Sequence, residues 1–272
     1  KDWEWTLGAT FTKNNSKVKE LWNGLDEYTY TSSRSVYYVM RVGQPVGEFR
    51  IPAPETVKDK NSPYYGYTVV NNNGRPNTSA TDYEYLGKAE ADFTMGFTTN
   101  LRWKNFSFSA TADWRKGGLM YSNTAYITHF NGNSTQTVYN ERNAFIYPNT
   151  VKIVNGEYVE NNIMVKSNEM HSNYNYSNNP YVRRNIVLPK DYFKLREVSL
   201  TYDFPKNLLT KTPFKKVMVS LVGRNLLLFT PKKNNYIDPE STNLGNDLTS
   251  EFGETTGTSS TRNFGANIKV VF

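Results

Sequence analysis

The sequence has no cysteine, only two histidines and no apolar run long enough to form a transmembrane helix. Without cysteine, a disulfide framework and Cys-based metal or redox chemistry are excluded. The longest apolar stretches, such as Leu226–Phe229, are strand-sized, far below the roughly 18 residues that a membrane-spanning helix needs. His129 and His171 lie in one long loop without the further ligands of a structural zinc site. The lack of a long apolar run therefore excludes a membrane-spanning helix as well.

Motifs for catalysis and for nucleic-acid binding are also missing. There is no Gly-x-Ser-x-Gly elbow, phosphate loop or His-Glu-x-x-His sequence. Carboxylates such as Glu48 and Glu55 could pair as in glycosidases, but nothing in the sequence places them the required roughly 5 to 10 Å apart. The net charge of +7 is dispersed along the chain, and no basic helix gathers it. We expect neither an enzyme nor a nucleic-acid-binding protein.

What the sequence has instead is a set of segments in which large apolar and polar residues alternate. In the first of them, Trp3, Trp5 and Leu7 alternate with Glu4 and Thr6, a period of two that places the apolar groups on one face of a strand. Each segment is about as long as a tilted transmembrane strand of roughly 9 to 11 residues, and aromatic residues lie near the ends, as in interfacial girdles. The predicted strands are approximately 3–14, 91–103, 106–116, 192–204, 216–230 and 262–272.

The connections between these strands alternate in length. The link at Lys104-Asn105 is short, and so is the link across 205–216, where Lys206 to Leu209 could form one helical turn. The links across 15–90, 117–191 and 231–262 are long. Short turns on one side and long loops on the other are typical of outer-membrane barrels. A slip in the alternation within 192–204 predicts a β-bulge near Arg196 and Glu197.

We therefore predict an all-β fold: a transmembrane antiparallel β-barrel with long extracellular loops and short periplasmic turns. Six strands are fewer than the roughly eight that close such a barrel, and unpaired strand edges are costly in lipid. We expect residues 1–272 to be one C-terminal barrel segment, with earlier strands and a signal peptide upstream of Lys1.

Several motifs in their order resemble the SusC/RagA family of TonB-dependent outer-membrane transporters from Bacteroidetes. The densest match is Tyr192–Lys206, which is similar to the family's penultimate-hairpin sequence. Three further motifs follow it along the chain: the strand with Gly223-Arg224-Asn225-Leu226, the loop Ile237-Asp238-Pro239-Glu240 and the final strand Asn263–Phe272. Earlier, Gly43–Phe49 resembles the family's G-x-P-x-G-x-[YF] loop, whereas Ala91 stands where the family's next motif usually has proline.

This resemblance implies a barrel of about 22 strands, of which these are the last six. It also implies an N-terminal plug, a SusD-like surface lipoprotein as a lid, and contact with TonB-ExbB-ExbD through the absent N-terminal region. The implied function is import of oligosaccharides, or in some members oligopeptides, across the outer membrane. Two alternatives stay open: a porin-like or adhesive barrel without active transport, and a soluble secreted β module that binds carbohydrate.

Candidate substrate-binding residues lie in the loop 117–191 and on nearby strands. This loop holds fifteen Asn and eight Tyr, and amides suit sugar hydroxyls while aromatic faces suit the apolar faces of sugars. Asx turns in a solvated loop, or a surface that docks the lid, would explain the same composition. Arginines on polar strand faces could contact substrate or be structural. The candidates are Trp114, Arg115, Tyr121, Tyr174, Tyr176 and Arg224.

The loop after the fifth strand is rich in side-chain oxygens. Asp238, Glu240 and Asp247 could hold a structural Ca²⁺, although their spacing matches no EF-hand and capping or turn roles explain them better. No other cofactor is expected. The resemblance gives Phe272 one further role, as the end that the barrel-assembly machinery recognises.

Overall fold

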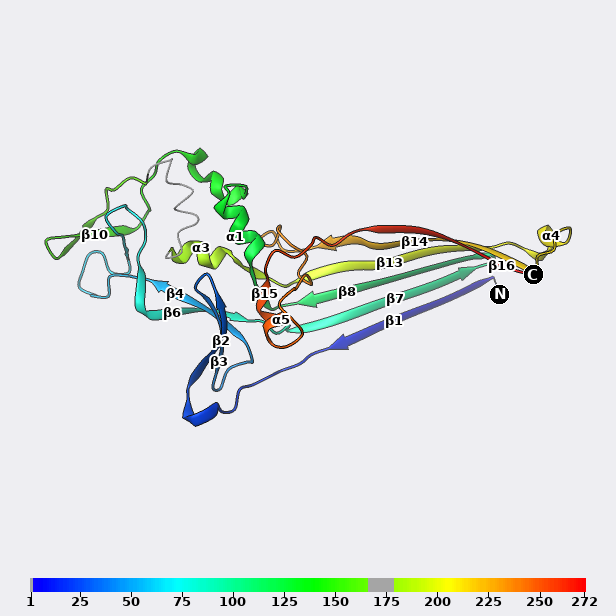
Figure 1. The fold of residues 1–272 in the computed structure, drawn as a ribbon, viewed down its shortest axis with the longest axis horizontal. Coiled ribbons are helices and arrows are strands. Elements are labelled where there is room, and N and C mark those ends of the chain that lie inside the picture. Colours follow the sequence, from blue (N-terminus) through cyan, green and yellow to red (C-terminus); the bar gives the residue numbers. More distant parts are fainter. Residues whose placement is uncertain (1, 166–178) are drawn as a thin grey trace.

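A long six-stranded antiparallel sheet forms one half of the molecule (Figure 1). The computed structural model describes residues 2–165 and 179–272. Every strand of this sheet begins and ends within two residues of the range expected from the alternation. In sheet order the strands are β1 (Trp3–Thr12), β7 (Phe93–Trp103), β8 (Phe106–Lys116), β13 (Tyr192–Asp203), β14 (Lys216–Phe229) and β16 (Asn263–Val271).

The register gives this sheet one apolar and one polar face. Residues directly opposite each other on antiparallel strands share a face. One row across all six strands is apolar: Trp5, Leu101, Phe108, Leu200, Leu221 and Ala266. The row beside it on the other face is polar: Glu4, Arg102, Ser107, Thr201, Ser220 and Asn267. Closure of the sheet into a barrel stays a prediction.

Aromatic side chains border the apolar face at both ends of the sheet. Near the chain termini, Trp3 stacks on Trp103 at 5.5 Å between ring centroids, and Phe106 contacts Tyr202 at 4.8 Å. At the other end, Phe93 contacts Phe11 at 5.6 Å and Trp114 at 5.0 Å. Between these borders lie exposed aliphatic side chains, for example Leu221 at 58% exposure. Two aromatic borders around an aliphatic band are typical of strands that cross a bilayer.

The predicted β-bulge is present in β13. The register shifts between Leu195 and Glu197 against both neighbouring strands, β8 and β14, which leaves Arg196 as the extra residue. Because one residue is added there, the alternation changes phase and Arg196 reaches Asp113, a residue of the polar face. The bulge thus directs an additional cation toward the polar side.

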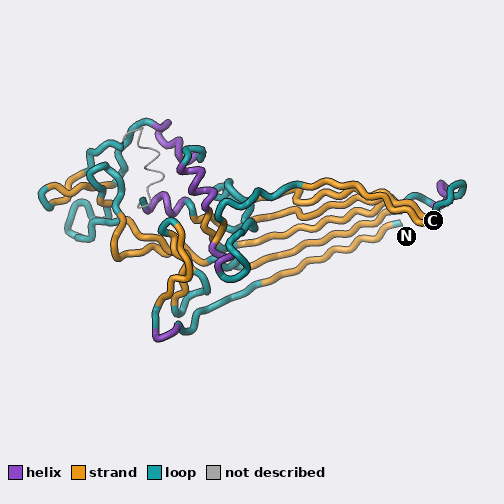
Figure 2. The backbone as a smooth tube through the Cα atoms, viewed as in Figure 1, coloured by secondary structure: helices purple, strands orange, loops and turns teal. Residues whose placement is uncertain are grey.

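The long connections fold together into a second body, which we call the cap: the described residues of 13–92, 117–191 and 230–262 (Figure 2). Its largest sheet is antiparallel and has four strands. These are β2 (Glu27–Ser33), β3 (Val36–Arg41), β4 (Glu48–Pro54) and β6 (Thr78–Lys88). The predicted long loops therefore have a fold of their own, which the alternation did not reveal.

The hydrophobic core of the chain lies in the cap. Tyr38, Phe49, Tyr121 and Phe252 pack together there, and Tyr121 stacks on Phe252 at 4.9 Å between centroids. They come from three separate connections, so this core ties those connections to one another. The six-stranded sheet, by contrast, leaves every residue of β1 and β16 exposed.

Two small three-stranded sheets and short helices complete the described part of the chain. Their bounds are β5 (Thr68–Val69), β9 (Leu119–Ser122), β10 (Thr150–Val154), β11 (Glu157–Glu160), β12 (Val187–Pro189), β15 (Gly253–Glu254), η1 (Trp22–Gly24), η2 (Thr135–Arg142), α1 (Asn123–Phe130), α3 (Pro180–Asn185) and α5 (Thr249–Phe252). The helical turn predicted between β13 and β14 is present as α4 (Lys206–Leu209). Within residues 2–165 and 179–272, no helix combines the length and apolar character needed to cross a membrane.

Candidate functional site

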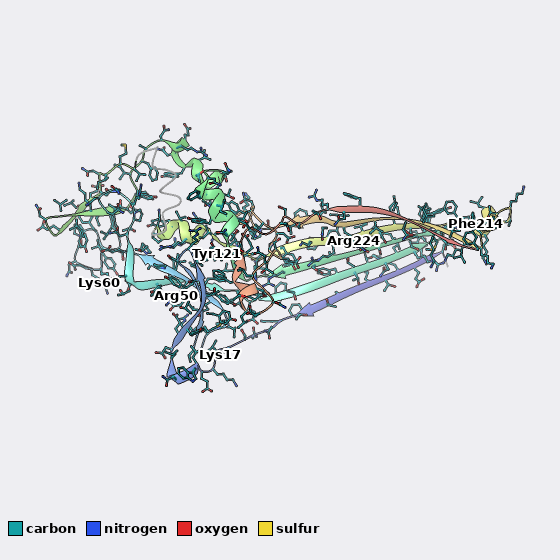
Figure 3. All side chains as sticks on the ribbon, in the orientation of Figure 1. Lys17, Arg50, Lys60, Tyr121, Phe214 and Arg224 are labelled. Atoms are coloured by element: carbon teal, nitrogen blue, oxygen red, sulfur yellow. The ribbon has the colours of Figure 1, made fainter. Side chains whose placement is uncertain are left out.

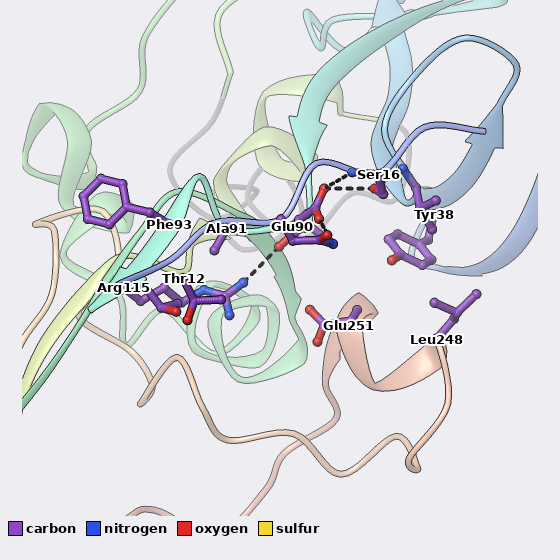
Figure 4. Close-up of a pocket in the computed structure, with 13 residues that line it drawn as sticks. Thr12, Ser16, Tyr38, Glu90, Ala91, Phe93, Arg115, Leu248 and Glu251 are labelled. Carbon is purple, nitrogen blue, oxygen red and sulfur yellow. Dashed lines mark hydrogen bonds between the residues drawn. The ribbon is translucent and has the colours of Figure 1, made fainter. Parts of the chain in front are cut away.

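A cavity of about 380 Å³ lies where the polar ends of three long strands meet the cap (Figure 4). We call it the mouth cavity. Thr12 of β1, Phe93 and Thr94 of β7 and Arg115 of β8 line it from the sheet. Its cap side is lined by Asn14, Ser16, Tyr38, Val46, Ala89, Glu90, Leu248 and Glu251.

Glu90 ties together segments of the cap beside the mouth cavity. Its carboxylate accepts hydrogen bonds from Asn14 Nδ2 at 2.5 Å and from Ser16 Oγ at 2.9 Å. The Ser16 hydroxyl in turn accepts from the backbone N–H of Val46 at 3.0 Å. This chain of hydrogen bonds fixes the segment that leaves β1 against the β3–β4 connection.

Glu251, on α5, lines the opposite side of the cavity. It forms an ion pair with the buried Lys190 at 2.7 Å between Nζ and Oε2. Burial raises the pKa of Glu251, but the attraction and hydrogen bond of Lys190 outweigh burial and lower it overall. Glu251 is therefore ionised at neutral pH.

The polar groups of the mouth cavity suit binding better than acid–base chemistry. Both carboxylates already accept hydrogen bonds from protein donors, so neither is placed as a free general base. Arg115 donates one hydrogen bond from Nη2 to Ala89 O at 3.1 Å, and its Nε has no partner among the residues that the structure describes. A ligand rich in hydroxyl or amide groups would match this mixture of donors and acceptors.

A cluster of charged residues joins the loop after β14 to the bulge of β13. We call it the clamp: Lys194, Arg196, Asp113, Asp238 and Glu240. Lys194 Nζ lies 2.7 Å from Asp238 Oδ2 and 2.6 Å from Glu240 Oε2. Arg196 binds Glu240 at 2.5 Å on one side and Asp113 at 2.5 Å on the other. Two of the motifs that resemble SusC/RagA therefore meet in space.

The clamp keeps Glu240 ionised over a wide pH range. Burial raises the pKa of this carboxyl, but hydrogen bonds from Arg196, Lys194 and the Tyr192 hydroxyl act in the opposite direction and lower it to about 2. The side chains of Lys194 and Asp238 are only 5% and 6% exposed. Charges this deeply buried require partners, so the clamp orders the loop rather than offering free ligands.

The structure separates the two neighbouring candidates Trp114 and Arg115. Arg115 lines the mouth cavity and stays a candidate for substrate contact. Trp114 lies on the opposite, apolar face, where it contacts Phe93 and is paired with Phe193. The expectation for Trp114 is therefore corrected: its alternation with Arg115 places it away from the polar side.

Tyr121 is also corrected. Its side chain is fully buried, stacked on Phe252, and its hydroxyl donates to Asn123 Oδ1 at 3.1 Å while accepting from Ser33 Oγ at 3.1 Å. It belongs to the cap core and presents no surface to a ligand. Tyr174 and Tyr176 lie outside the described residues.

Arg224 and Phe272 lie away from the mouth cavity. Arg224 is on the polar face, where its Nε donates to Glu197 Oε2 at 2.7 Å, and its side chain is 66% exposed. This exposure leaves the arginine accessible from the polar side of the sheet. Phe272 lies at the other end, with its ring 5.3 Å from that of Phe214, and its role in barrel assembly stays a prediction.

The three calcium candidates do not form one group. Asp238 and Glu240 bind Lys194 in the clamp, whereas Asp247 accepts hydrogen bonds from the backbone and hydroxyl of Thr249. In the described part of the chain, no three His, Cys, Asp or Glu side chains are arranged to hold a metal ion. Ion pairing and turn formation account for these oxygens.

Sequence reasoning did not find Glu90 or Glu251 as cavity residues. They are 161 positions apart in the sequence, and neither lies on a strand in which apolar and polar residues alternate. The loop with Asp238 and Glu240 was expected to bind calcium or to form turns, and its ion pairs with Lys194 and Arg196 were not predicted.

Comparison with known proteins supports the resemblance. Among curated proteins, the chain is similar to the TonB-dependent receptor P3 of Formosa agariphila, with 24% identity over 262 residues, covering 90% of this chain and 24% of that protein. Its fold matches a structure of the RagAB peptide importer in the "closed-closed" state, with a TM-score of 0.64 and 21% identity over 99% of this chain and 27% of the other. The "open-open" state matches with a TM-score of 0.62 and 20% identity over 100% and 27%.

The chain is thus similar to a segment of a TonB-dependent receptor, with the fold of the corresponding part of the RagAB importer. It spans about a quarter of the length of the relatives that it matches. Those relatives are described as receptors, transporters or importers, not as enzymes. No protein-family model matches the SusC/RagA-like chain.

Proposed function

We propose that the complete protein is an outer-membrane, TonB-dependent importer of oligosaccharides or oligopeptides, and that residues 1–272 form part of its barrel wall and outer mouth. The observation that carries this proposal is the two-faced sheet joined to a folded cap. Exposed apolar side chains between two aromatic borders suit lipid, and the polar face suits a water-filled lumen. The TonB-dependent relative supports active import over a passive pore.

The proposal fixes an orientation for the chain. Long connections of outer-membrane barrels face the outside and short turns face the periplasm. The cap, built from the long connections, then forms the extracellular mouth, and the turns at Lys104-Asn105 and α4 face the periplasm. The mouth cavity lies on the route from the outside to the lumen, and Arg115 and Arg224 are the candidate substrate contacts. A SusD-like lipoprotein would cover the cap as a lid.

Growth and uptake assays test this function. Deletion of the gene should abolish growth on one class of oligosaccharide or oligopeptide as the sole carbon source, with growth on the corresponding monomer unchanged. Restoring the gene without its upstream TonB-contact segment should leave the defect in place. Full uptake from that second strain would contradict active import and favour the porin-like or adhesive alternative.

Replacement of Arg115 tests the mouth cavity within the same strain. Arg115→Gln removes the charge that faces the cavity, and loss of a charged hydrogen bond costs about 1.5 to 3 kcal/mol, or about 10- to 100-fold in affinity. Lys152→Gln is a matched control, because Lys152 is a cap residue that does not line the cavity and its Nζ donates to Asn162 Oδ1 at 2.6 Å. Unchanged substrate affinity in Arg115→Gln would remove Arg115 from the substrate site.

A further inference from the structure

A second cavity, of about 460 Å³, lies at the other end of the sheet and is strongly basic. We call it the basic pocket. Five cationic side chains and one carboxylate line it: Arg102, Lys104, Lys206, Lys215, Lys216 and Asp203. Five positive charges and one negative charge give +4, more than half of the formal net charge of +7 of the whole chain. The fold thus brings five of the 32 Lys and Arg residues together at one place.

The basic pocket opens on the polar face of the sheet. Arg102, Ser107 and Thr201 line it, and all three belong to the polar row described above. Its remaining walls come from the two short turns near α4, at the end of the molecule where both chain termini and Phe214 lie (Figures 1 and 3). The apolar face, with its aromatic border, lies on the other side of the strands.

Most of these cations have no anionic partner among the described residues. Lys216 lies 3.1 Å from Asp203, and Lys104 lies over the Trp103 ring at 5.5 Å. Across residues 2–165 and 179–272, no carboxylate forms an ion pair with Arg102, Lys206 or Lys215. Like charges held together repel one another, and binding of an anion relieves that repulsion.

The backbone around the pocket is fixed without a ligand. Asn105 Nδ2 donates to Asp203 O at 2.7 Å, and Asp203 N donates to Asn105 O at 2.8 Å. Lys215 N donates to the carbonyl of Val271 at 2.7 Å. The turns that carry the cations are therefore tied to the ends of the strands, so little backbone ordering would accompany binding.

We propose that the basic pocket binds an acidic peptide segment that enters from the lumen or the periplasm. Charge complementarity calls for several carboxylates, and a volume of about 460 Å³ holds a few side chains of such a segment. A lipid headgroup fits less well because lipid would contact the apolar face, opposite to the pocket. This inference uses the proposed assignment of the polar face to the lumen, but it concerns a contact that import alone does not require.

Carbodiimide cross-linking of the complete protein in intact outer membranes tests this inference. The reagent joins an amine to a carboxylate only when the two are in contact. Cross-links should join Lys206 or Lys215 to an Asp or Glu of a peptide outside residues 1–272, identified by mass spectrometry. Lys211 is the matched control, because it lies in the same connection and is exposed but does not line the pocket.

Charge reversal and salt separate the outcomes. The double variant Lys206→Glu/Lys215→Glu keeps the amines of Lys104 and Lys216. The yield of cross-links from these two lysines to the external peptide should fall at least tenfold in the double variant. The same yield should not change in Lys211→Glu. High salt should weaken the product of the natural protein. The proposal would be overturned if the only cross-links were to Asp203, if no cross-link formed, or if Lys211→Glu lost the product equally. It would also be overturned if anionic phospholipid co-purified with the natural protein and was lost only in the double variant. Uptake is read separately, so failure of this test leaves the importer function standing.

Discussion

The charged side chain of Lys194 is almost fully buried, and burial of a charge costs free energy unless the charge has partners. Its ammonium group is almost inaccessible and depends on Asp238 and Glu240 for compensation. These two carboxylates belong to the β14–β16 connection, so the need of one buried lysine fixes the position of a loop 44 residues away in sequence. The clamp therefore fixes one part of the β14–β16 connection to β13 through single residues.

Asp238→Asn should release this loop. Removal of one partner of a buried pair costs about 3 to 5 kcal/mol, and we expect about 3 because Glu240 still contacts Lys194. Hydrogen exchange of the Ser241 amide, which donates to Asp238 O at 2.9 Å, should accelerate about 100-fold. Asp247→Asn, in the same loop, keeps an oxygen for Thr249 and should leave exchange unchanged. Equal acceleration in both variants would contradict the role of the clamp.

Acidification should open the same loop at a defined pH. The pKa of Glu240 is lowered from its ordinary 4.5 to about 2, so its ionised form stabilises the folded loop above pH 4.5, and this stabilisation is lost as the pH falls from about 4.5 to 2. Protease resistance of residues 231–262 should therefore persist at pH 5 to 7 and decline below about 4.5. Glu240→Gln should remove this pH dependence. A loss of resistance near pH 6 in the natural protein would show that another group controls the loop.

At the scale of elements, the long strands could be read from the sequence and the cap could not. A strand of nine or more residues repeats its alternation several times, so β7 and β8 were located to within two residues. Most cap strands are short, and register shifts interrupt β2 and the longer β6, so no period persists long enough to be recognised. The cap core also joins residues distant in sequence, which is why Tyr121 was expected to contact substrate.

The Gly43–Phe49 motif shows what one cap element requires. Gly47 has a φ of +78°, and a Cβ there would lie 2.0 Å from the buried Tyr38 hydroxyl oxygen. Gly43 has a similar φ of +83° with open space around it. The two positions therefore share backbone strain and differ only in packing.

Gly47→Ala should destabilise the cap more than Gly43→Ala. Both variants incur the cost of a left-handed conformation, about 1 kcal/mol, and Gly47→Ala should add about 1 to 3 kcal/mol for overpacking against Tyr38. Thermal unfolding followed by the near-ultraviolet signal of the cap tyrosines measures the difference. Equal melting temperatures would show that Tyr38 moves aside without cost.

At the scale of the whole molecule, the chain combines two bodies with different physical demands. The cap has an ordinary buried core, whereas the long sheet exposes aromatic and aliphatic side chains on one face and charged and hydroxyl groups on the other. Such a sheet is stable only between two different environments, which is the central claim of the outer-membrane assignment.

Site-directed spin labelling along β14 tests that claim most directly. Residues 217–222 alternate between the faces, and the chain has no cysteine to compete with an introduced label. In the complete protein in lipid, labels at Val217, Val219 and Leu221 should be accessible to oxygen, and labels at Met218, Ser220 and Val222 to a water-soluble nickel reagent. Accessibility without this period of two, or accessibility of both faces to the nickel reagent, would contradict the account.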